Sequence, residues 1–190
     1  MQTISKTWES YYAKLKVNQV DPKCPEENEV VRRTMGPWRY KEHAEMIINE
    51  INVQDSILEI GCGFGGLAQE ILKKINVSYT VVDNEIMLNQ AKRFLADTVE
   101  YIEAKKIETL QGRKFGLFIS NFCLSEVPPE YQKYVVKNII CNCQVIFIID
   151  RTDNFIGEEL ERQFTIKKTQ YSKDQSIYIG RKIKKQLGIK

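Results

Sequence analysis

LEIGCGFGG, residues 58–66, joins the end of an apolar segment to a glycine-rich turn and the start of a helical pattern. Glycines let the backbone turn sharply and let a ligand approach the main chain, while the following helix offers free N–H groups. Gly61, Gly63 and Gly66 also satisfy the dinucleotide pattern G-x-G-x-x-G, which packing alone can produce. The stretch therefore predicts a nucleotide-like ligand without identifying it.

A carboxylate follows the next apolar run along the chain. Asp83 comes 20 residues after Gly63 and ends a predicted strand. At that edge of a sheet a carboxylate can accept hydrogen bonds from ribose hydroxyls. The alternative is that Asp83 caps the helix predicted to begin near Glu85.

Short apolar runs alternate with helical patterns from Asp55 onward, which predicts an α/β domain with a mostly parallel sheet covered on both faces. Strands are expected over Ser56–Ile60, Val77–Val82, Val99–Ile102, Phe115–Ser120 and Val145–Ile149. Helices are expected over Gly66–Lys74, Glu85–Ala96, Pro129–Ile140 and Gly157–Arg162. A polar turn joins Phe164–Thr169 to Ser176–Ile179, which indicates a closing antiparallel hairpin.

Two helical patterns precede the first strand. The first is carried by Ile4, Trp8, Tyr11, Tyr12 and Leu15, and the second begins at Pro37. A chain of 190 residues is short for two domains, so we expect a single domain over 1–190. Residues 1–54 would form its N-terminal helical cap and 55–190 its α/β core.

Composition excludes several classes of protein. The hydrophobic content is 43% and the charged content 28%, and no apolar run is long enough to cross a bilayer. The first residues do not resemble a secretory signal, so we expect a cytoplasmic protein. A net charge of +3 does not indicate a nucleic-acid partner, and the basic tail from Arg181 to Lys185 is interpreted as a solvated end.

The residues quoted above, taken with two later segments, resemble a known family. Ile57–Gly65, Tyr79–Asp83 and Tyr101–Ala104 are similar to successive motifs of class I S-adenosylmethionine-dependent methyltransferases. Glu59 favours this family over dinucleotide dehydrogenases, in which that strand position is normally apolar. The resemblance implies the Rossmann-like methyltransferase fold, a doubly wound, mostly parallel seven-stranded sheet closed by an antiparallel hairpin.

The resemblance also implies a donor site for S-adenosylmethionine, with S-adenosylhomocysteine as the product. Glu59 would hold the ammonium group, the backbone of Gly61 and Gly63 would lie under the sulfonium part, Asp83 would take the ribose and Glu103 the adenine amino group. The remaining positions expected to line the donor are Cys62, Phe64, Asn84, Ala104 and Asn121.

A narrower resemblance concerns the acceptor. Phe115–Glu126 and Gly63–Ala68 are similar to sugar O-methyltransferases of bacterial polysaccharide clusters, with Phe122 in place of a usual tyrosine. This implies methylation of a sugar or polysaccharide hydroxyl. Two alternatives are left open. The acceptor could be a small metabolite, a protein or RNA, or the chain could be a catalytically silent binding domain. Base N-methylation is disfavoured because Asn121 is not followed by a Pro-Pro-aromatic loop.

An alcohol must lose its proton to accept a methyl group, which requires a base within hydrogen-bond reach. The candidates are Glu126, just past the fourth predicted strand, and His43, the one histidine of the chain.

Alternatively, Asp150 could bind Mg²⁺ together with Glu126 and Asp153. The cysteines lack paired metal-ligand spacing, so no zinc site is expected. The expected substrate-binding residues are Arg39, Tyr40 and Ser125.

Overall fold

The computed structural model describes residues 37–50, 56–151 and 156–183. The first predicted helix and Asp153 lie outside these ranges. The second predicted helix is α3 (Pro37–Glu50), which begins at a proline, as expected for a first helical position. No helix within the described ranges is long and apolar enough to span a membrane.

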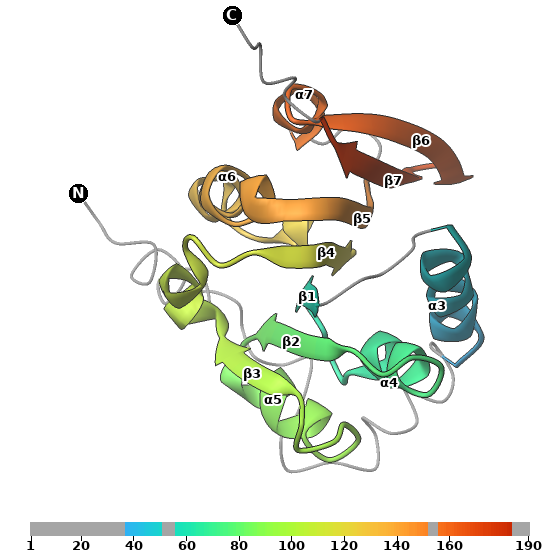
Figure 1. The fold of residues 1–190 in the computed structure, drawn as a ribbon, viewed down its shortest axis with the longest axis vertical. Coiled ribbons are helices and arrows are strands. Elements are labelled where there is room, and N and C mark those ends of the chain that lie inside the picture. The colour runs from blue at the N-terminus through green and yellow to red at the C-terminus, as the bar shows by residue number, and fades with distance from the viewer. Residues whose placement is uncertain (1–36, 51–55, 152–155, 184–190) are drawn as a thin grey trace, which may run out of the picture.

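A seven-stranded sheet forms the centre of the molecule, with the order β3-β2-β1-β4-β5-β7-β6 (Figure 1). The first five strands pair in parallel, and β7 is antiparallel to both β5 and β6. The strands are β1 (Ser56–Ile60), β2 (Ser78–Asp83), β3 (Glu100–Glu103), β4 (Phe115–Asn121), β5 (Cys143–Arg151), β6 (Phe164–Ser172) and β7 (Gln175–Lys182). The predicted doubly wound sheet and its closing hairpin are confirmed.

Helices cover both faces of this sheet because its central strands are apolar on both sides. Along β1, Ile57 belongs to one buried cluster, whereas Leu58 and Ile60 belong to the other, as side-chain alternation requires. The first face carries α3, α4 (Gly66–Leu72) and α5 (Glu85–Ala91). The second carries the short 3₁₀ helix η1 (Ala104–Leu110), α6 (Pro129–Asn138) and α7 (Ile156–Glu161). Two further 3₁₀ turns are η2 (Leu124–Glu126) and η3 (Ile140–Asn142).

Three sequence predictions need correction. Helix α5 ends at Ala91 instead of Ala96, and η1 was not predicted. Arg181 and Lys182, predicted to belong to a solvated tail, are instead part of β7, and Lys184 and Lys185 lie outside the described residues. The Arg181 guanidinium donates a hydrogen bond to the Glu50 carbonyl at 2.9 Å, and the Lys182 ammonium contacts the Cys141 carbonyl. These two cations therefore fasten the last strand to its neighbours.

The chain changes direction across the sheet between β1 and β4. It leaves β1 towards β2 and β3, then crosses to β4 on the other side of β1. At such a point the two connecting loops diverge and leave a crevice beyond the carboxyl ends of the strands. Here the loops also touch, because a Cβ added at Gly61 would lie 2.2 Å from the Cβ of Cys123. Gly61 has φ +84°, so a side chain there would be strained as well.

The contact at Gly61 can be tested with a matched pair of substitutions. Gly112 has a similar φ of +80°, but an added Cβ would meet nothing within 4 Å. Gly112→Ala should therefore lower the free energy of unfolding by about 1–2 kcal/mol through backbone strain alone. Gly61→Ala should lower the free energy of unfolding by about 1–3 kcal/mol more than Gly112→Ala does, because it also overpacks the loop against Cys123. Urea unfolding measures both, and equal losses would contradict the steric role of Gly61.

Candidate functional site

The glycine turn and the end of β2 are joined by a direct hydrogen bond. The Gly63 N–H donates to Asp83 Oδ2 at 2.8 Å, although the two residues are 20 positions apart. A Cβ added at Gly63 would meet nothing within 4 Å, so the backbone there borders open space. Burial raises the pKa of Asp83 to about 6, although hydrogen bonds from the backbone of Gly63 and Asn84 lower it in part. The Asp83 carboxylate is thus held against the turn.

The alternative role for Asp83, as a helix cap, is wrong. Asn84 is the N-cap of α5, and its side-chain oxygen accepts a hydrogen bond from the Met87 N–H at 3.0 Å. Asp83 Oδ1 instead accepts from the backbone N–H and the side-chain amide of Asn84, at 2.7 and 2.9 Å. Asn84 therefore caps the helix and also helps to orient Asp83.

Glu59 is buried, with 1% of its surface exposed. Its Oε2 accepts a hydrogen bond from the Tyr79 hydroxyl at 2.9 Å, a partner that sequence reasoning did not identify. Burial raises the pKa of Glu59 to about 8; the Tyr79 bond lowers it, and the charge of Asp83 raises it further. Without a ligand, Glu59 is therefore mainly an uncharged acid at pH 7.

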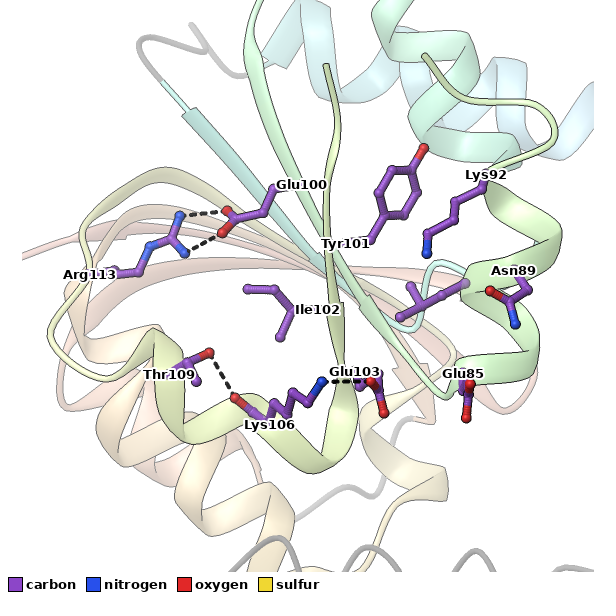
Figure 2. Close-up of a pocket in the computed structure, with 11 residues that line it drawn as sticks. Glu85, Asn89, Lys92, Glu100, Tyr101, Ile102, Glu103, Lys106, Thr109 and Arg113 are labelled. Carbon is purple, nitrogen blue, oxygen red and sulfur yellow. Dashed lines mark hydrogen bonds and ion pairs between the residues drawn. The ribbon is translucent and has the colours of Figure 1, made fainter. Parts of the chain in front are cut away.

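The next predicted donor contacts lie around β3. Glu103 ends β3 and makes ion pairs with Lys105 at 2.7 Å and Lys106 at 2.8 Å, which lower its pKa. It lines a pocket of about 320 Å³ at the outer edge of the sheet, between α5, β3 and η1 (Figure 2). Ala104 is buried, and its carbonyl accepts a hydrogen bond from the Tyr131 hydroxyl at 3.2 Å.

Within the glycine turn, the thiol of Cys62 is buried and lies 3.6 Å from the Gly63 carbonyl oxygen. Phe64 is half-buried. Tyr40, on α3, packs so closely over Gly66 that a Cβ there would lie 2.4 Å from its ring. The side chain of Arg39 lies outside the described part of the structure.

A second group of side chains meets at the carboxyl end of β4. The side-chain nitrogen of Asn121 lies 3.2 Å from Nδ1 of His43, which is fully buried on α3. The ring of Tyr171, on β6, packs edge-on against the His43 ring with 5.3 Å between centroids. Tyr171 also contacts Phe122, whose φ is +58°. Tyr171 was missed because the predicted strand ended at Thr169.

The other candidate base lies in a different environment. Glu126 is exposed at the end of η2.

Asp150 is buried, and its two carboxylate oxygens accept hydrogen bonds from the N–H groups of Ser125 at 2.9 Å and Arg151 at 2.8 Å. Within the ranges that the structure describes, no three His, Cys, Asp or Glu residues form a metal-binding group. The proposed Mg²⁺ site is therefore not supported.

Comparisons with known proteins agree with this geometry. Residues 57–142 match the family model of a methyltransferase domain. No curated protein shows a significant match to the sequence.

Several solved structures share the fold of this chain. A Thermoplasma acidophilum protein aligns with a TM-score of 0.65 and 16% identity, over 97% of this chain and 100% of that one. A complex of DhpI with S-adenosylhomocysteine aligns with a TM-score of 0.66 and 15% identity, over 96% of this chain and 98% of that one. Mitomycin 7-O-methyltransferase MmcR aligns with a TM-score of 0.60 and 13% identity, over 95% of this chain and 69% of that one. The chain therefore has the Rossmann-like methyltransferase fold.

The protonation of Glu59 provides a test of its predicted contact with the donor. If a donor ammonium approaches, the carboxyl group should ionise and release a proton at pH 7, because its pKa without ligand is about 8. Donor affinity should then rise with pH up to about 8. Calorimetry of S-adenosylhomocysteine binding should give enthalpies that differ between phosphate and Tris buffers, and Glu59→Gln should remove most of that difference.

The same enthalpy in both buffers for the wild-type protein would contradict the ammonium contact. Glu59 would then remain a protonated partner of Tyr79 and serve only the packing of the sheet.

Proposed function

We propose that this protein is an S-adenosylmethionine-dependent O-methyltransferase whose acceptor is a hydroxyl group of a sugar or polysaccharide. The observation that carries the proposal is the hydrogen bond from Gly63 to Asp83 across the open glycine turn, at the β1–β4 crossing. The turn leaves room for a ligand against the main chain, and a carboxylate still has acceptor positions for ribose hydroxyls. Both features suit a nucleoside-containing donor.

The donor, when bound, supplies a methyl group on a positively charged sulfur. Methyl transfer forms the O–C bond as the C–S bond breaks, and the bonding electron pair stays on sulfur. The protein must hold the acceptor oxygen in line and remove its proton. Asp83 and the glycine turn would fix the donor, while the groups at the end of β4 would face the acceptor.

We favour His43 over Glu126 as the base that takes this proton. His43 is fully buried beside Asn121, the last residue of β4 at the crossing point. Water is excluded there, and an imidazole is the side chain that most often serves as a general base. Glu126, by contrast, is exposed to solvent.

A hydroxyl acceptor is supported by two observations. The Phe115–Glu126 segment is similar to that of sugar O-methyltransferases, and one structural neighbour is named as a 7-O-methyltransferase. The aromatic rings of Phe122 and Tyr171 lie close together beside His43, where they could pack against the apolar face of a sugar ring.

Donor binding is tested by calorimetry with S-adenosylhomocysteine and NAD. S-adenosylhomocysteine should bind and NAD should not, and Asp83→Ala should weaken binding by about 1–3 kcal/mol because the ribose loses its charged acceptor. Asp97→Ala, which removes an exposed carboxylate elsewhere, is the control and should leave affinity unchanged. NAD binding without a response to S-adenosylhomocysteine would overturn the proposal.

The acceptor and the base are tested by methyl transfer to a panel of sugar nucleotides and polysaccharide fragments. His43→Gln should lower turnover by roughly 10²–10⁴-fold, whereas Glu126→Gln should leave it nearly unchanged. Both variants should keep the wild-type affinity for S-adenosylhomocysteine. The reverse pattern would make Glu126 the base, and methylation of RNA or protein alone would exclude the sugar acceptor.

A further inference from the structure

His43 is held in place by the contacts of its helix with two other parts of the molecule. Towards α4, Glu45 pairs with Lys74 at 3.1 Å. Towards the β6–β7 hairpin, Glu50 pairs with Lys167 at 3.4 Å, and its carbonyl accepts the bond from Arg181. These ion pairs are exposed and contribute little, but His43 is fully buried and packs against the Tyr171 ring, which defines the position of the imidazole. Which of its two nitrogens carries the proton depends on their hydrogen-bond partners.

The amide group of Asn121 bears on that question directly. In the structure the Asn121 side-chain nitrogen faces Nδ1 of His43 at 3.2 Å. An amide nitrogen only donates hydrogen bonds, so Nδ1 is the acceptor, and the neutral ring carries its proton on Nε2. In this tautomer Nε2 has no lone pair with which to take a proton from an alcohol.

The same amide can also select the other tautomer. Its oxygen is buried and accepts no hydrogen bond from any residue in the described ranges. Half a turn of the amide would bring this oxygen to Nδ1, where it would accept a hydrogen bond from Nδ1–H and leave the lone pair on Nε2. Either orientation leaves one buried amide group for a ligand to satisfy, so a ligand that satisfies the nitrogen can reverse the orientation found in the structure.

The backbone and a neighbouring ring restrict what else can move. Asn121 is the last residue of β4 and is paired with Ile149 of β5, and the next N–H, of Phe122, donates to the Ile149 carbonyl at 2.8 Å. The Tyr171 ring lies edge-on to His43 at a register shift in β6, a place where bulges often redirect a side chain. The backbone of Asn121 is therefore held in place, whereas its amide can still rotate about the last bond of the side chain.

We propose that Asn121 is a positioning residue that sets the tautomer of His43, and that its amide turns when the acceptor binds so that Nε2 can take the hydroxyl proton. This rests on the proposed function. The hydroxyl proton passes to Nε2, the Nδ1–H of the resulting imidazolium is held by the amide oxygen, and the proton later leaves to water. The sequence analysis predicted Asn121 only as a residue that lines the site of the methyl donor.

The tautomer can be measured without any assay of activity. The chain has one histidine, so the ¹⁵N shifts of its imidazole are assigned without ambiguity. The ligand-free wild-type protein should show the proton on Nε2. In Asn121→Asp the ionised carboxylate can only accept, so the proton should move to Nδ1. Asn89→Asp, an exposed change on α5, should leave the wild-type tautomer in place.

Turnover provides the second readout. Asn121→Leu keeps a similar volume but cannot hydrogen-bond, so it should lower kcat by roughly 10–100-fold with KM for the acceptor little changed. Asn121→Asp should recover most of that loss, since it holds the productive tautomer. An identical tautomer in the wild-type protein and Asn121→Asp would overturn the proposal. The tautomer could differ between the wild-type protein and Asn121→Asp while the wild-type protein transfers no methyl group to any sugar. That result would contradict the proposed function but would still support the role of Asn121 in setting the tautomer.

Discussion

The absence of a side chain at Gly61 is the constraint on which the site depends. At the crossing between β1 and β4, the loop after β1 passes so close to Cys123 that a Cβ on Gly61 would overlap it. This contact brings the glycine turn beside the end of β4. Because Asp83 ends the strand on the other flank of β1, the same turn also meets its carboxylate. The ends of β1, β2 and β4 thus meet at the glycine turn.

Two buried carboxyl groups determine the electrostatics around the glycine turn. Glu59 and Asp83 both have raised pKa values, about 8 and about 6, and burial is the main cause for each. Two acids in this state lower the stability of the ligand-free fold at neutral pH, since the unfolded chain ionises them more readily. Such groups are frequent where a protein binds a charged ligand, and a cationic donor would relieve the cost of ionising them.

The sequence allowed the sheet, the glycine turn and Asp83 to be predicted, because strand periodicity and short spacings determine them. Strand β1 was predicted with its observed bounds. The contact of His43 with Asn121 could not be predicted, since it joins residues 78 positions apart and depends on how α3 packs. The charge state of Glu59 was equally inaccessible, as burial and Tyr79 decide it. The role of Asp83 beside the turn became clear only once Asn84 was found to cap α5.

A crystal structure with S-adenosylhomocysteine tests the central claim most directly. The account predicts that the ribose hydroxyls bind the Asp83 carboxylate, that the main chain at Gly63 lies against the ligand, and that the sulfur faces the Asn121 and His43 side of the crevice. A nucleoside bound instead in the pocket at the outer edge of β3, with Asp83 contacting only Gly63 and Asn84, would contradict it.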